Sequence, residues 1–177
     1  ASFTRLFIAN LNAESAPGVL SPRLFTVLPL AFAYYYVYAR LRNCPEDGFA
    51  IERKRGAAGL FNYFGAITVA ALMRFELSPD WVVAGWAALV VILLAMAAQS
   101  KQTIYLHQGL LLCVAVAFRT AFHNFMLPQY YPPGEWQRPV LTVGTAAALL
   151  FCSLPFAFRL RAQAEPGAAQ GRLARLA

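Results

Sequence analysis

Ionisable side chains inside an apolar stretch are the residues of this sequence best suited to chemistry, because a charge within a membrane is costly and is kept mainly where it has a role. The stretch at residues 104–127 is the most polar of five apolar stretches. Arg119 and His123 lie four residues apart in it, so a helix puts both on one face. With polar residues at the ends of neighbouring stretches they form a candidate intramembrane cluster: Arg119, His123, Asn124, Glu76, Asp80 and Arg74.

Two interpretations of this cluster stay open. In the first it is a proton relay or an anion site, because histidine titrates near neutral pH and arginine is always charged. In the second, Arg119 pairs with one acidic side chain or with the carbonyls of a helix end, and it serves packing alone.

The two histidines bear on whether the chain holds a cofactor. His107 and His123 are sixteen residues apart in one stretch, which is about 24 Å along a helix and about 160° around it. This excludes a haem held by two histidines of this chain. A pigment with a single histidine ligand, either His107 or His123, stays open, and the cofactor is otherwise unknown.

Other patterns of reactive residues are absent from the sequence. The three cysteines are scattered, with no Cys-x-x-Cys pair and no Cys/His cluster at metal-binding spacing. No nucleophile elbow and no glycine-rich phosphate loop occur. We therefore predict no metal site, no catalytic residue and no enzyme activity.

The elements that must position these residues follow from composition. The 177 residues are 59% hydrophobic and only 13% charged, about half the charge of a soluble domain. Five stretches are long enough to cross a hydrocarbon core of about 30 Å as helices. We predict an all-α, polytopic helical membrane protein with spans at about residues 23–39, 56–77, 81–98, 104–127 and 140–158.

A faint internal repeat affects how the ends of the chain are interpreted. Arg5 with Asn10 and Arg119 with Asn124 share one spacing, at a period near 115 residues; a chance alignment of two Ala/Leu/Phe-rich helices would give the same match. On the repeat hypothesis, residues 1–20 contain the end of an outer-side helix and a loop, and the chain is a piece of a longer protein. Residues 21–161 form the helical bundle, and residues 162–177 form a flexible cytoplasmic tail.

Orientation follows from the basic residues. Ten of the fifteen lie in residues 40–55, in residues 99–103 and after residue 158, whereas residues 76–80 and 128–139 hold one between them. The positive-inside rule then places the C-terminus in the cytoplasm. Basic residues that flank apolar spans contact lipid headgroups, so we expect no nucleic-acid binding.

Three motifs carry a family resemblance: Arg-Phe-Glu-Leu-x-Pro-Asp-Trp at 74–81, Gly-Trp-Ala-Ala-Leu at 85–89 and the Arg-x4-Asn helix end. On these, residues 60–161 resemble the repeat units of large, uncharacterised bacterial inner-membrane proteins. The resemblance implies a polytopic, repeat-built protein of the bacterial inner membrane. It implies no activity.

These patterns together favour a non-enzymatic structural or accessory subunit of a larger inner-membrane assembly, with the lipid bilayer and other membrane subunits as its partners. Small-residue faces, such as Gly65 with Ala66 and Gly144-x-x-x-Ala148, suit close helix packing. One alternative is a component of a transporter or channel that uses the polar fourth span. A second alternative is a membrane subunit that binds a pigment through one histidine.

Overall fold

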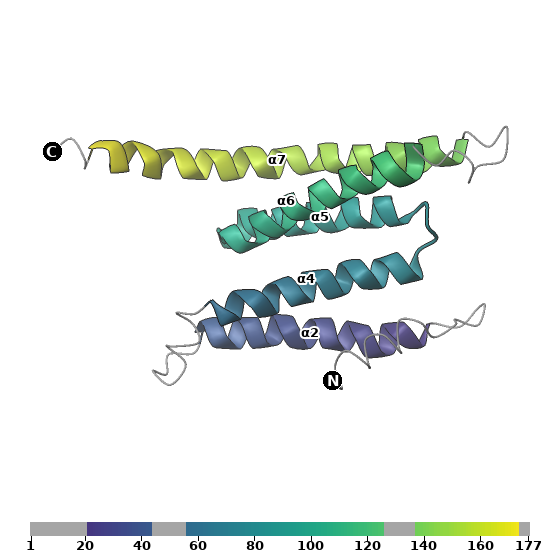
Figure 1. Ribbon diagram of the computed structural model, residues 1–177. Coiled ribbons are helices and arrows are strands. Elements are labelled where there is room, and N and C mark those ends of the chain that lie inside the picture. Colours follow the sequence, from purple (N-terminus) through teal and green to yellow (C-terminus); the bar gives the residue numbers. More distant parts are fainter. Residues whose placement is uncertain (1–20, 44–55, 126–136, 174–177) are drawn as a thin grey trace. The chain divides into compact units, whose positions relative to one another are not determined.

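The computed structural model describes residues 21–43, 56–125 and 137–173, and every secondary-structure element in these ranges is a helix. This confirms the predicted all-α fold. The predicted partial helix within residues 1–20 lies outside the described residues. The helices are α2 (Pro22–Asn43), α4 (Ala57–Glu76), α5 (Val82–Ser100), α6 (Thr103–Arg119), η2 (Thr120–Phe125) and α7 (Gln137–Leu173) (Figure 1).

Five helical segments of about 20 residues are long and apolar enough to cross a membrane, which confirms the predicted number of such helices. Their lengths match a hydrocarbon core of about 30 Å. The fourth span joins α6 to η2, and residues 126 and 127 of its predicted range lie outside the described residues. The five segments are Leu24–Asn43, Ala57–Glu76, Val82–Ser100, Thr103–His123 and Val140–Arg159.

The structure differs from the sequence expectation at two helix ends. The fourth span changes from α-helix to π-helix at Thr120. Hydropathy cannot indicate this change, because both helix types satisfy their backbone hydrogen bonds within the segment. At the C-terminal end, α7 continues through residues 162–173, where the sequence predicts a flexible tail. Ala and Gln in this segment favour a helix, whereas Pro166, Gly167 and Gly171 disfavour one, so helix propensity does not explain the extension.

The chain divides into two compact units, residues 1–79 and residues 80–177. In unit 1, α2 and α4 run side by side in opposite directions (Figure 1). The ring of Tyr35 lies against Gly65, where an added Cβ would come within 3.0 Å of Cε2 and Cζ. Gly65 therefore lets the two helices approach more closely than a larger residue allows.

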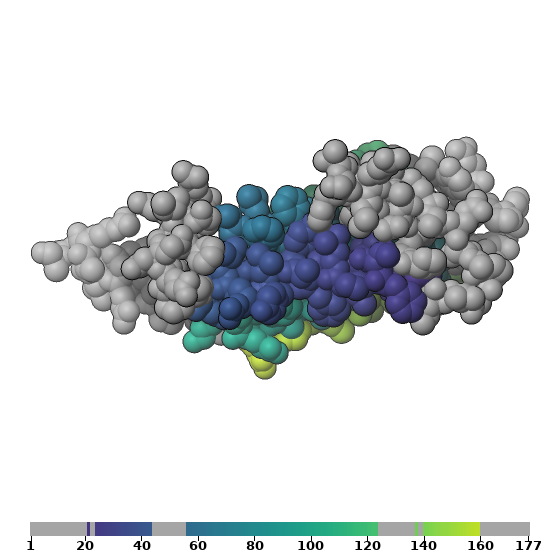
Figure 2. Space-filling model, turned by 90° about the horizontal axis from the view of Figure 1, so that it is seen from below, coloured from purple at the N-terminus to yellow at the C-terminus, as the bar shows by residue number. Residues whose placement is uncertain are grey.

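The surface that α2 turns away from α4 is seen directly in Figure 2. Large apolar side chains on α2 are exposed, among them Phe25, Leu28, Phe32 and Tyr36. They recur at helical spacing, as expected for one face of a helix. An exposed apolar face of this kind suits contact with lipid acyl chains or with another membrane helix.

Unit 2 is built around α5, which packs against both α6 and α7. Half of the α5 span is buried, compared with 22% of the fourth span and 17% of the fifth. Leu94 of α5 lies against Gly109 of α6, where an added Cβ would meet Leu94 Cδ2 at 3.1 Å. The core of unit 2 consists of Val83, Ala87, Val90, Leu94, Val116 and Ala146.

A tight turn joins α5 to α6. Lys101 adopts a left-handed backbone conformation with φ of 55°, and its N–H donates to the carbonyl of Ala97 at 2.9 Å. A left-handed residue after a helix closes its last turn and reverses the chain. The short connection through Lys101 and Gln102 therefore holds α5 and α6 as antiparallel neighbours.

Two glycines of unit 2 provide a matched test of close packing. We expect Gly109→Leu to lower the free energy of unfolding by about 1–3 kcal/mol, because the added side chain meets the buried Leu94. Gly144→Leu is the control, since no atom lies within 4 Å of an added Cβ at that position in the described residues. The free energy of unfolding of both variants is measured in mixed detergent micelles. Equal stability of the two variants would contradict the packing of Leu94 against Gly109.

Candidate functional site

The polar residues of the fourth span gather where α6 gives way to η2. Thr120 begins the π-helix, and its hydroxyl donates to the carbonyl of Val116 at 2.8 Å. A single turn of π-helix widens the helix and is frequent at functional sites. His123 lies within this turn, at the end of unit 2 where α5 begins and η2 ends. We call this end the Asp80 end.

Arg119 is the last residue of α6 and is half-buried. Its Cζ lies 5.8 Å from the centroid of the Trp86 ring on α5. A guanidinium over an indole face gains a cation–π attraction, which grows as water is excluded. Trp86 thus offsets part of the cost of holding a cation inside the apolar fourth span.

His123 faces an acidic side chain of the same unit. Its Nε2 lies 3.9 Å from Oδ1 of Asp80, and the two side chains are 23% and 30% exposed. The distance exceeds a hydrogen bond but allows an ion pair when the imidazole is protonated. Asp80 directly precedes α5 at Val82, so the pair links the start of α5 to the end of the fourth span.

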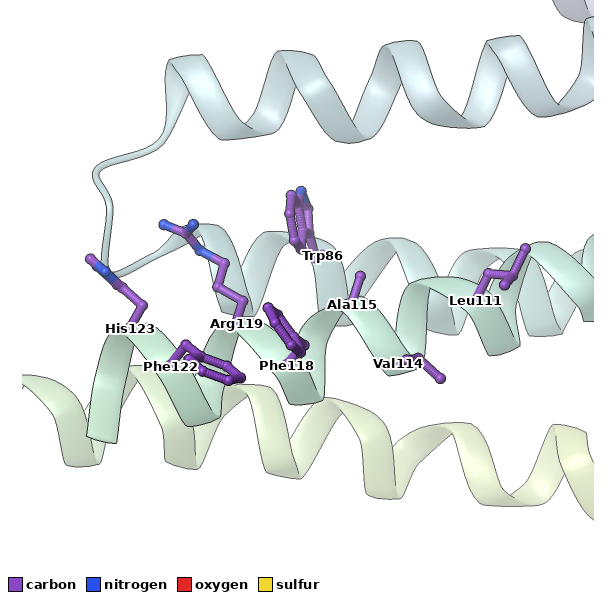
Figure 3. Close-up of a pocket in the computed structure, with 8 residues that line it drawn as sticks. All are labelled: Trp86, Leu111, Val114, Ala115, Phe118, Arg119, Phe122 and His123. Carbon is purple, nitrogen blue, oxygen red and sulfur yellow. The ribbon is translucent and has the colours of Figure 1, made fainter. Parts of the chain in front are cut away.

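A groove of about 530 Å³ runs along α6 beside these residues (Figure 3). Arg119 and His123 lie at the Asp80 end, and Leu111 lies toward the other end of the groove (Figure 3). The rings of Phe118 and Phe122 are 4.2 Å apart at their centroids and form part of the wall. The groove is lined by Trp86, Leu111, Val114, Ala115, Phe118, Arg119, Phe122 and His123.

The groove therefore combines a charged end with an apolar wall. Arginine presents a planar set of donors that suits phosphate or carboxylate. The apolar wall suits a hydrocarbon chain. We find no other charged side chain besides Arg119 and the titratable His123 among the eight residues that line this groove.

A second groove in unit 2 has a different character. It measures about 340 Å³ and is formed by α6, η2 and α7. Its lining residues are Val116, Ala117, Thr120, Ala121, Val143, Ala146, Ala147 and Leu150. No charged residue lines this second groove, so it presents no charged group to a ligand.

The structure brings some of the predicted cluster together. Arg119 and His123 line one groove, and Asp80 lies against His123. Asn124 belongs to η2, one residue beyond His123. Arg74 and Glu76 lie at the end of α4 and belong to unit 1, whereas the residues that line the groove belong to unit 2. Their membership of one cluster with Arg119 stays a prediction.

His107 lies near the start of α6 and is exposed. The helix between His107 and His123 is continuous, so the two imidazoles belong to opposite ends of the span. The part of the chain that the structure describes holds no group of three or more His, Cys, Asp or Glu side chains placed for one metal ion. A pigment ligated by one histidine remains a hypothesis for each residue.

Sequence reasoning missed Trp86 and the phenylalanines of the groove. Trp86 lies in the Gly-Trp-Ala-Ala-Leu motif at 85–89, which by itself gives no indication of a cation on another helix. Phe118 and Phe122 follow one another at a spacing of four residues, which indicates a shared helix face. That spacing could have suggested an aromatic wall next to Arg119.

The Arg119–Trp86 contact can be measured with a double-mutant cycle. We expect Arg119→Gln and Trp86→Leu to show a coupling free energy of about 0.5–2 kcal/mol, because each change alone removes the cation–π attraction. The measurement is unfolding of the two single variants and the double variant in mixed micelles. A control cycle pairs Arg159→Gln with Trp86→Leu and should give no coupling. Equal coupling in both cycles would contradict the contact.

Comparison of the chain with protein-family models, with curated proteins and with solved structures found no match. The resemblance to repeat units of bacterial inner-membrane proteins therefore stays a prediction.

Proposed function

We propose that the chain is a non-enzymatic structural or accessory subunit of a larger assembly in the bacterial inner membrane. Five apolar helices fit an integral membrane protein, and in four of the five spans less than a third of the residues are buried. The uncovered surface would contact the lipid bilayer and other membrane subunits.

The observation that carries this proposal is the small-residue face of α7. Gly65 and Gly109 are each covered by a side chain of the neighbouring helix, whereas an added Cβ at Gly144 meets nothing within 4 Å. Ala147 and Ala148 are also exposed. Small residues at such spacing let a second helix backbone approach closely in a membrane.

Larger side chains border this face. Leu141 and Phe151 are 63% and 72% exposed and lie one turn before Gly144 and one turn after Ala147 and Ala148. The α7 surface therefore has a shallow central depression between two projecting side chains. That shape suits a projecting side chain of a partner helix, as in knobs-into-holes packing.

The proposal includes an orientation of the chain in the membrane. If the five spans alternate, the ends that carry Arg40 and Arg42, Lys101 and Arg159 lie on one side of the membrane. Positive charge at these ends favours the cytoplasmic side. The C-terminus after Arg159 is then cytoplasmic, and these charges contact anionic headgroups and not nucleic acid.

Two alternatives remain distinguishable by experiment. A transporter or channel component would conduct substrate after reconstitution of the chain alone into proteoliposomes. A pigment-binding subunit would show visible absorption after purification, and the absorption would fall on replacement of His107 or His123. An accessory subunit would show neither property when separated from its partners.

A variant of α7 tests the accessory-subunit proposal. We expect Gly144→Leu to reduce recovery of partner subunits with the tagged chain at least several-fold, because leucine fills the depression. Recovery is measured by affinity purification from the host membrane in mild detergent and by native gel. Ala157→Leu is the control: it is exposed on the same helix, about 140° around the axis from Gly144. If the wild-type chain migrates on the native gel without any partner subunit, the proposal is contradicted.

Reporter fusions test the orientation independently. We expect green fluorescent protein fused after Ala177 to be fluorescent and alkaline phosphatase at the same position to be inactive, because the positive-inside rule places this end in the cytoplasm. Fusions inserted after Pro79 should show the opposite pattern. An active phosphatase at the C-terminus would reverse the proposed topology.

A further inference from the structure

We propose that the groove beside Arg119 binds an anionic phospholipid, with the headgroup phosphate at the guanidinium and one acyl chain along α6. This assignment is independent of the accessory-subunit proposal, because the groove and the small-residue face of α7 share no residue.

The charged end of the groove matches a phosphate. Arg119 is the lining residue that carries a positive charge at every physiological pH, and its guanidinium lies over Trp86. Figure 3 shows the Arg119 side chain directed toward the His123 end of the groove. Planar guanidinium donors bind phosphate oxygens in pairs, which favours a phosphate over a neutral headgroup.

The neighbouring acidic residue lies to one side of this position. Asp80 does not line the groove, and its carboxylate lies 3.9 Å from Nε2 of His123. Among the eight residues that line the groove, Arg119 is the one with a permanent positive charge.

The depth of Arg119 suits a headgroup. Arg119 lies four residues before His123, the last residue of the fourth span, which is about 6 Å inside the end of that span. A long arginine side chain spans such a distance and brings its charge to the interface. Trp86 lies five residues into α5, at the same end of unit 2, where indole rings favour the membrane interface.

The apolar wall suits an acyl chain in length and volume. Leu111 and Phe122 are eleven positions apart along the helix, about 16 Å, which is close to half of a hydrocarbon core of about 30 Å. The groove volume of about 530 Å³ falls in the usual range of ligand sites. One chain can therefore lie along α6 while the phosphate stays at Arg119.

The position of the wall within a membrane span selects a lipid over a soluble anion. All of its α6 residues lie inside the span Thr103–His123. Within unit 2, Leu111, Val114 and Phe118 are 63%, 67% and 63% exposed. A lipid reaches this wall by lateral diffusion, whereas a free phosphate gains nothing from it.

Quenching of Trp86 by brominated lipids tests the proposal. The full chain carries Trp81→Phe and Trp136→Phe, so that Trp86 is its single indole, and is reconstituted into phosphatidylcholine vesicles. Brominated phosphatidylglycerol and brominated phosphatidylcholine are compared as quenchers. We expect phosphatidylglycerol to bind beside Trp86 about tenfold more tightly, as for one charge-assisted hydrogen-bonded contact.

Two matched pairs of variants separate charge from shape. Arg119→Gln should abolish the preference for phosphatidylglycerol, whereas Arg159→Gln, with the same net charge, should retain it. Ala115→Phe fills the groove and should weaken quenching by both brominated lipids. Ala117→Phe, which lines the second groove, should leave quenching unchanged. Circular dichroism and gel filtration confirm that each variant folds.

Several results would overturn the assignment. Equal quenching by the two lipids in the parent protein would exclude anionic selectivity at this site. Displacement of the brominated lipid by inorganic phosphate would indicate a soluble-anion site. A photocrosslinker at Leu111 that captures a protein helix instead of lipid would show that another part of this chain, a second copy or a partner covers the groove.

Discussion

A backbone that crosses hydrocarbon must satisfy its own hydrogen bonds, and the rest of this structure depends on that constraint. All described elements are helices, in which each interior N–H meets a carbonyl of the same segment. The side-chain hydroxyls follow the same rule. Thr120, Thr145 and Ser153 each donate to a carbonyl three or four residues earlier. These three hydroxyls thus find acceptors within their own helix.

Once the backbone is satisfied, helix association depends on shape, because lipid is as apolar as the side chains. Glycines then decide where helices meet. Gly65 accepts the ring of Tyr35 and Gly109 accepts Leu94, so α2 packs on α4 and α5 on α6. The same physics explains why α5, which contacts two helices, is the most buried of the five spans. It also supports the proposed partner at Gly144, since a small-residue face gains dispersion energy only when another helix packs against it.

The sequence predicts the elements better than their contacts. Hydropathy and length locate five spans within a few residues, because the hydrocarbon thickness fixes both. The faces that pack are harder to predict, since helices that are apolar all round carry little periodic pattern. Asp80 and His123 could be grouped from span ends alone, and the structure places them 3.9 Å apart. Trp86 could not, because its contact with Arg119 joins two helices at residues far apart in the sequence.

The distribution of polarity along the groove limits what it can do. Arg119 and His123 lie at one end, and the lining from Leu111 to Ala115 is wholly apolar. A solute that crosses a membrane needs polar partners through both halves of the bilayer, and transporter sites accordingly lie near the midplane. A groove charged at one end and apolar beyond it favours an amphiphile that enters from the lipid and stays. Such a ligand would cover exposed apolar side chains and place its phosphate beside Arg119, and both contacts would stabilise a protein embedded among lipids.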